Sequence, residues 1–92
     1  MTVINIKKKH QLPLIELKQK IDSIIIEMGK RLEFNSEWEN EYSLIFKRKG
    51  ASGNIEIDEN NFELTLRLGL MYKSLKGVIH SEISAAVSKK LN

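Results

Sequence analysis

The segment Phe62-Glu63-Leu64-Thr65-Leu66-Arg67-Leu68 carries the clearest structural signal in the chain. Large apolar residues alternate strictly with polar residues along it, which predicts a half-buried β-strand with one polar face. Shorter segments with the same period of two precede it. They lie over 2–7, around Trp38, over 42–48 and over 54–58. Turn-forming residues separate the later segments at Asn40-Glu41, over 50–53 and over 58–61, so we expect an antiparallel meander in the middle of the chain.

Two segments with helical periodicity flank the meander. Apolar residues recur at intervals of three and four from Leu14 onward, and again from about Leu70. The first stripe comprises Leu14, Leu17, Ile21, Ile24, Ile25, Met28 and Leu32, and the second comprises Leu75, Val78, Ile79, Ile83, Ala86, Val87 and Leu91. The sequence therefore predicts an α+β fold in the order β-α-β-β-β-β-α, with two amphipathic helices packed on one face of an antiparallel sheet.

The composition fits a single small domain over residues 1–92. Hydrophobic residues make up 41% and charged residues 29% of the chain, which argues against a wholly disordered protein. Without cysteine, disulfides and cysteine nucleophiles are excluded. The longest apolar run, residues 24–26, is far shorter than the about 20 apolar residues of a membrane-spanning helix. No targeting segment is visible, and we expect a cytoplasmic protein.

Candidate catalytic residues are scarce. His10 and His80 are the only histidines, and neither has the neighbours of a catalytic triad or a metal site. The acidic residues Glu37, Glu39 and Glu41 alternate on a short strand and turn, as a solvated strand does. We therefore expect a protein that is not an enzyme and holds no metal and no cofactor.

Basic residues form three clusters in a chain whose net charge is only +3. The clusters are Lys7, Lys8 and Lys9; then Lys47, Arg48 and Lys49; then Lys73 and Lys76. If they meet at one end of the sheet, they form an anion- or nucleic-acid-binding patch; the alternative is an ordinary solvated surface. The expected open face of the sheet has no aromatic residue for base stacking, which makes nucleic acid an unlikely partner. That face comprises Ser43, Lys47, Asn54, Glu56, Glu63, Thr65 and Arg67.

The segment Leu70-Met71-Tyr72 just before Leu75 is too apolar to be an ordinary connection. These three side chains cannot all point inward, so we expect one or two of them to be exposed. An apolar patch on a small domain indicates a partner, a dimer or a hydrophobic surface, whereas the alternative is that the three close the end of the core. The sheet edges also leave a homodimer open as a further interpretation.

Several quoted segments together resemble a known family. His10-Gln11-Leu12 leads into the first helix, and Trp38 precedes Phe46-Lys47-Arg48-Lys49-Gly50-Ala51-Ser52-Gly53-Asn54-Ile55. Then follow Leu68-Gly69-Leu70-Met71-Tyr72-Lys73-Ser74-Leu75-Lys76-Gly77-Val78-Ile79 and Glu82-Ile83. The chain resembles the polyhydroxyalkanoic acid system proteins, small bacterial proteins also described as a granule-region family. Their pattern is H-x-L, a Trp, F-x-R-x-G-x-x-G-x-I and L-G-x-x-x-x-x-L-K-G-x-I-x-x-E-I.

The resemblance implies a small accessory protein without a catalytic residue set to carry over. We expect it to bind the surface of a polyhydroxyalkanoate granule, or a granule-associated protein. The expected contact is Leu70, Met71 and Tyr72 with Lys73 and Lys76 at the rim, and the matched positions Arg48 and His10 are further candidates. Gly77 also matches the pattern, and a glycine inside a helix suggests a close-packing partner or ligand at that turn. The alternative remains a small anion- or nucleic-acid-binding module.

Overall fold

A computed structural model describes residues 2–91, except for the side chains of residues 30–32, so the expected core position Leu32 lies outside the described side chains. The elements are β1 (Thr2–Lys9), α1 (Leu14–Leu32), β2 (Asn35–Trp38), β3 (Ser43–Arg48), β4 (Ala51–Ile57), β5 (Asn61–Leu68), the 3₁₀ helix η1 (Leu70–Leu75) and α2 (Lys76–Leu91). The predicted α+β order is confirmed. No helix within residues 2–91 combines the length and apolar character needed to cross a membrane.

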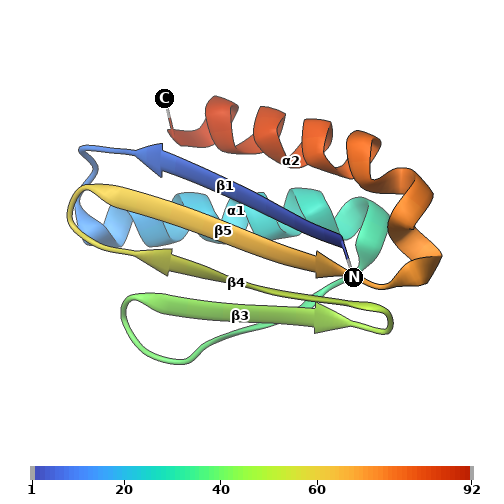
Figure 1. Ribbon diagram of the computed structural model, residues 1–92. Helices are drawn as coiled ribbons and strands as arrows, with labels where there is room; N and C mark the ends of the chain where they lie inside the picture. Colours follow the sequence, from blue (N-terminus) through green and yellow to red (C-terminus); the bar gives the residue numbers. More distant parts are fainter. Residues whose placement is uncertain (1, 92) are drawn as a thin grey trace.

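The sheet has five strands in the order β1-β5-β4-β3-β2, and all neighbouring strands are antiparallel. Strands β2 to β5 form the predicted meander, and β1 adds to its far edge by pairing with β5 from Thr2↔Leu68 to Lys9↔Asn61. Helices α1 and α2 cover one face of this sheet, as predicted (Figure 1). The other face is open and polar.

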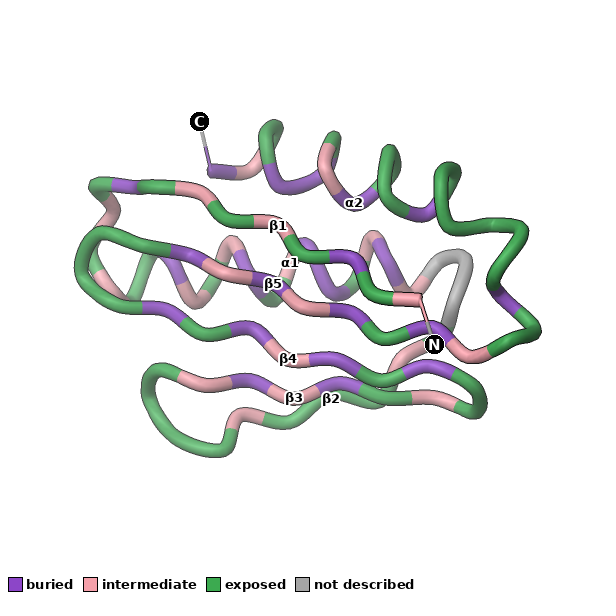
Figure 2. The backbone as a smooth tube through the Cα atoms, in the orientation of Figure 1, coloured by how far each residue is buried: buried purple, intermediate pink, exposed green. Residues whose placement is uncertain are grey.

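The core lies between the sheet and the helices. Buried and exposed residues alternate along β4 and β5, as the period of two in the sequence requires (Figure 2). From β5 the buried side chains are Phe62, Leu64, Leu66 and Leu68, and from α1 they are Leu17, Ile21, Ile24, Ile25 and Met28. Burial of these apolar surfaces is the main force that holds the two layers together.

A close approach between β3 and β4 fixes the centre of the sheet. Phe46 stands directly opposite Gly53, and Phe34 packs edge-on against the Phe46 ring with centroids 5.0 Å apart. A Cβ atom added at Gly53 would lie 2.6 Å from Phe46 Cζ and 2.4 Å from the Thr65 carbonyl oxygen. Only glycine therefore leaves room for the Phe46 ring at this position.

Two local predictions were wrong. The expected turn over residues 50–53 is confined to Lys49-Gly50, where Gly50 supplies a φ of 84°, and β4 already begins at Ala51. Leu75 and Val78 were expected in the buried stripe of the second helix, but they are 46% and 49% exposed. Leu75 lies in the 3₁₀ helix over residues 70–75, whose tighter winding changes the angular spacing on which the stripe was based, whereas Val78 lies in α2 beside the buried positions Ile79 and Ile83.

Candidate functional site

The connection between β5 and α2 places two large apolar side chains in solvent. Leu70 is 84% exposed and Met71 is 63% exposed, whereas Tyr72 is only 7% exposed. The prediction that one or two of these three side chains would be exposed is confirmed. Lys73 and Lys76 follow on the same segment and are also exposed.

This exposed segment is held against the turn between β3 and β4. The Gly69 N–H donates a hydrogen bond to the Gly50 carbonyl oxygen at 2.8 Å. The Met71 thioether lies over the same turn, because a Cβ atom at Gly50 would be 2.7 Å from Met71 Sδ. We call this end of the molecule the tip and define it as Lys49, Gly50, Leu70, Met71 and Lys73. It is an apolar surface with lysines beside it, held to the sheet by the Gly69–Gly50 hydrogen bond.

Arg48 lies immediately behind the tip. It is the last residue of β3, on the strand face that carries Leu44 and Phe46, and it therefore faces the helices. Its guanidinium lies over the Tyr72 ring, with Cζ 5.6 Å from the ring centroid. This contact links the end of β3 to η1.

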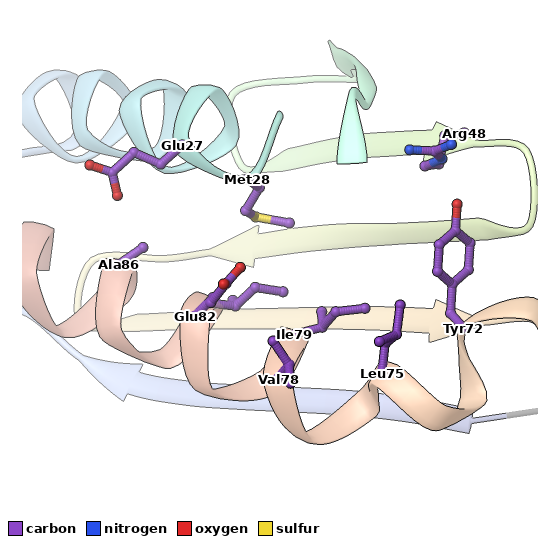
Figure 3. A pocket seen from close by; sticks show the side chains of 10 residues that line it. Glu27, Met28, Arg48, Tyr72, Leu75, Val78, Ile79, Glu82 and Ala86 are labelled. Atoms are coloured by element: carbon purple, nitrogen blue, oxygen red, sulfur yellow. The ribbon is translucent and has the colours of Figure 1, made fainter. Parts of the chain in front are cut away.

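A groove of about 590 Å³ runs from this contact between α1 and α2. Its lining residues are Glu27, Met28, Arg48, Tyr72, Leu75, Val78, Ile79, Glu82, Ile83 and Ala86. Arg48 and Tyr72 lie at one end of the groove, and Glu27 and Ala86 lie at the other (Figure 3). At the second end Lys90 Nζ is 3.5 Å from Glu27 Oε1, which ties α2 to α1.

The structure separates His10 from the other candidate residues. Pairing of Lys9 with Asn61 and of Thr2 with Leu68 puts His10 at the end of the sheet opposite the tip. His10 is 6% exposed, and both ring nitrogens meet backbone groups. Nδ1 accepts from the Leu12 N–H at 3.1 Å, so Nε2 carries the proton and donates to the Asp58 carbonyl oxygen at 2.9 Å. His10 thus joins the start of α1 to the β4–β5 turn.

The three basic clusters do not meet. Strands β1 and β3 run in opposite directions, because each neighbouring pair between them is antiparallel. The lysines at the end of β1 therefore lie at the sheet end away from the tip, whereas the end of β3 lies at the tip, where Gly50 meets the segment that carries Lys73. The sequence left open whether the three clusters converge, and the strand directions show that they do not form one patch.

Acidic residues make no metal site in the part of the chain that is described. No group of three or more His, Asp or Glu side chains within residues 2–91 is arranged to hold a metal ion. Asp58 instead organises the β4–β5 turn, and its Oδ1 accepts hydrogen bonds from the N–H groups of Asn60 and Asn61 at 2.8 and 2.7 Å. The hydrogen bond from the Asn60 backbone is the largest cause that lowers the pKa of the Asp58 carboxyl below its usual value of 3.8. The hydrogen bonds from Asn61 lower it further.

The groove was not found by sequence reasoning. Met28, Ile79 and Ile83 belong to the apolar stripes and were interpreted as core, which they also are. The sequence held a partial signal of the groove, since Leu75 at the end of η1 and Val78 at the start of α2 are apolar residues in addition to the buried stripe. Gly77, where a close-packing partner was expected, has no neighbour within 4 Å of an added Cβ atom in the described structure.

The fold and the tip define a small two-layer α+β protein with an apolar and basic end. The chain belongs to the family described as "Putative polyhydroxyalkanoic acid system protein", whose model matches residues 4–91. The match includes β1 from Ile4 onward, strands β2 to β5, both helices to Leu91 and the whole tip. No curated protein matches the chain.

Proposed function

We propose that this protein is a non-enzymatic accessory protein that docks on the polyhydroxyalkanoate granule surface through its tip. The observation that carries the proposal is the exposure of Leu70 and Met71 on a segment fixed to the sheet by the Gly69–Gly50 hydrogen bond. Leu70 and Met71 are adjacent and both exposed, and a contiguous apolar patch indicates an interaction site where single exposed apolar residues do not. Membership in the polyhydroxyalkanoic acid system family supports the granule as the surface that this patch contacts.

The free energies expected from burying the apolar side chains and from the lysine charges suit reversible docking. Moving a leucine or methionine side chain from water to an apolar phase is worth about 1.5–3 kcal/mol. A lysine close to a negatively charged surface adds about 1 kcal/mol, and this part weakens with salt. Two apolar anchors with Lys73 and Lys76 beside them therefore support binding that is released on dilution.

Co-sedimentation with native granules tests the proposal. The variant Leu70→Glu/Met71→Glu replaces both exposed anchors and leaves the buried Tyr72 in place. We expect its bound fraction to fall by about tenfold or more, because two burial terms are lost and two negative charges are added. The matched control is Ile15→Glu/Ile26→Glu, which makes the same charge change at residues 76% and 66% exposed on α1.

Equal loss of binding in both double variants would contradict docking by the tip. Granules stripped of their proteins distinguish the surface from a granule-associated protein. Binding that persists on stripped granules supports the proposal, whereas binding that disappears would replace the surface with a protein partner. Circular dichroism and thermal unfolding must show that each variant is folded.

A further inference from the structure

We propose that the groove between α1 and α2 is a binding site for a linear alkanoate, with the carboxylate at Arg48 and the hydrocarbon chain along the helices. The proposal concerns a dissolved small molecule, not the granule surface, and it uses residues behind the tip. The volume of the groove, about 590 Å³, is in the range of about 300–1,000 Å³ that is typical of small-ligand sites.

The walls of the groove are suited to a hydrocarbon chain. Met28 projects into it from α1, and Val78 and Ile79 project from α2 (Figure 3). Val78 is 49% exposed although it faces this space, so a ligand there would remove apolar surface from water. The methionine side chain adapts readily to an irregular chain beside it.

The charges set the direction of the ligand. Arg48 is the groove's only positively charged lining residue among those described, and its planar guanidinium with five N–H donors matches a carboxylate. Glu27 lies at the end of the groove away from Arg48, and Glu82 extends from α2 between the two ends (Figure 3). An anionic head group is therefore attracted to the Arg48 end, because Lys90 at the other end already pairs with Glu27.

The ends of the groove favour a compact ligand over a bound helix of a partner protein. The Arg48–Tyr72 contact bounds one end, and the Lys90–Glu27 ion pair connects the two helices at the other. A partner helix lays a long apolar face into a groove, and these two connections limit the length of groove that it could occupy. A single chain with one charged head fits between the two connections.

Decanoate is the probe for the test, and isothermal titration calorimetry of the whole chain is the measurement. We expect saturable binding of decanoate and at least about tenfold weaker binding of decyltrimethylammonium, which has the same chain and the opposite charge. Arg48→Gln should weaken decanoate binding by about tenfold or more. The matched control Arg67→Gln removes the same charge from the open sheet face and should leave the affinity unchanged.

A second variant keeps the test decisive if Arg48→Gln does not fold. Val78→Phe places a larger ring in the groove from an exposed helix position and should weaken decanoate binding while the protein stays folded. Amide chemical-shift changes on α2 near Ile79 and Ile83, with none on the open sheet face, would place the ligand. Absence of saturable binding, equal affinity for the two amphiphiles, or unchanged affinity in folded Arg48→Gln or Val78→Phe would overturn the proposal. Granule co-sedimentation of the same variants separates this outcome from failure of the tip.

Discussion

The Arg48 guanidinium lies over the Tyr72 ring, 5.6 Å from its centroid, and so joins the last residue of β3 to the 3₁₀ helix that follows β5. The Tyr72 ring thereby contributes both to the groove and to the exposed segment beside it. On one side Tyr72 forms the end of the groove, and on the other it anchors the segment that exposes Leu70 and Met71. Loss of this ring should affect the stability of the domain and the order of η1 together.

Substitutions at Tyr72 separate the ring from its hydroxyl group. Tyr72→Phe keeps the ring under Arg48, so we expect the free energy of unfolding to change by less than about 1 kcal/mol. Tyr72→Leu removes the ring from a position only 7% exposed and should cost about 1–3 kcal/mol. Urea unfolding measures both values. Equal losses in the two variants would show that the hydroxyl, not the ring, is the important group.

Two glycines should respond to alanine in opposite directions. At Gly53 the new methyl group would lie 2.4 Å from the Thr65 carbonyl oxygen, so Gly53→Ala should destabilise the domain by about 1–3 kcal/mol or more. At Gly77 the space is open and the backbone is helical, so Gly77→Ala should stabilise it by about 0.5–1 kcal/mol. Thermal unfolding of the pair checks this. A destabilised Gly77→Ala would mean that this turn needs glycine for a reason other than space.

His10 should act through its two hydrogen bonds to the backbone. His10→Ala leaves the Leu12 N–H and the Asp58 carbonyl without their ring partners, and we expect a loss of about 1–3 kcal/mol. His10→Asn keeps a side-chain oxygen near the Leu12 N–H and should lose less. Chemical denaturation distinguishes the two. If both variants lose the same amount, the bond to Leu12 contributes little.

Asp58 should make the stability of the domain depend on acidity. Its pKa is lowered in the folded protein by the Asn60 backbone N–H and its neighbours, so the ionised form is the one that folding favours. This contribution is present above about pH 4, the ordinary pKa range of aspartate, and it is lost as the pH falls through the lowered folded value.

Urea midpoints measured from pH 7 to pH 2 test this dependence. The stability difference between the natural protein and Asp58→Asn should be greatest at neutral pH and shrink in acid. The control Glu59→Gln removes the adjacent charge but leaves the Asp58 hydrogen bonds in place. A stability difference between the natural protein and Asp58→Asn that does not vary with pH would contradict the role of the ionised Asp58 carboxyl.

The lysines beside the tip should give granule association its salt dependence. Lys73→Gln/Lys76→Gln removes two charges near the docked surface and should weaken association by about 1–2 kcal/mol at low ionic strength. The matched control is Lys7→Gln/Lys9→Gln, at the opposite end of the sheet. Co-sedimentation over a range of salt concentrations measures the effect. An equal loss in the control would mean that net charge, not its location, governs binding.

The order of helices and strands was predictable because the spacing of the apolar residues changes wherever a strand gives way to a helix or a helix to a strand. The alternation over 62–68 and the three-and-four spacing after Leu14 each depend on which side chains face the core, and the structure has both elements where they were expected. The limits of β4 were not predictable from its glycines. Gly50 is required by backbone conformation, whereas Gly53 is required by the Phe46 ring from another strand.

The site was less accessible to sequence reasoning because it depends on strand directions. Exposure within residues 70–72 followed from there being too many large side chains to bury in one short segment. Whether the lysines of β1 and β3 share an end depends on where β1 joins the sheet, which no local pattern encodes. The groove depends on the relative placement of α1 and α2, and its lining residues look like ordinary core residues.

The pairing of β1 with β5 also governs when the fold can be completed. Thr2 pairs with Leu68, which lies 66 residues further along the chain, so β1 has no partner in the sheet until β5 has formed. Contacts between parts of a chain that are so far apart in sequence form slowly. The meander from β2 to β5 can form earlier from local hairpins, with β1 as its last strand. Pairing of β1 with β5 is therefore expected to be the last step in completing the sheet.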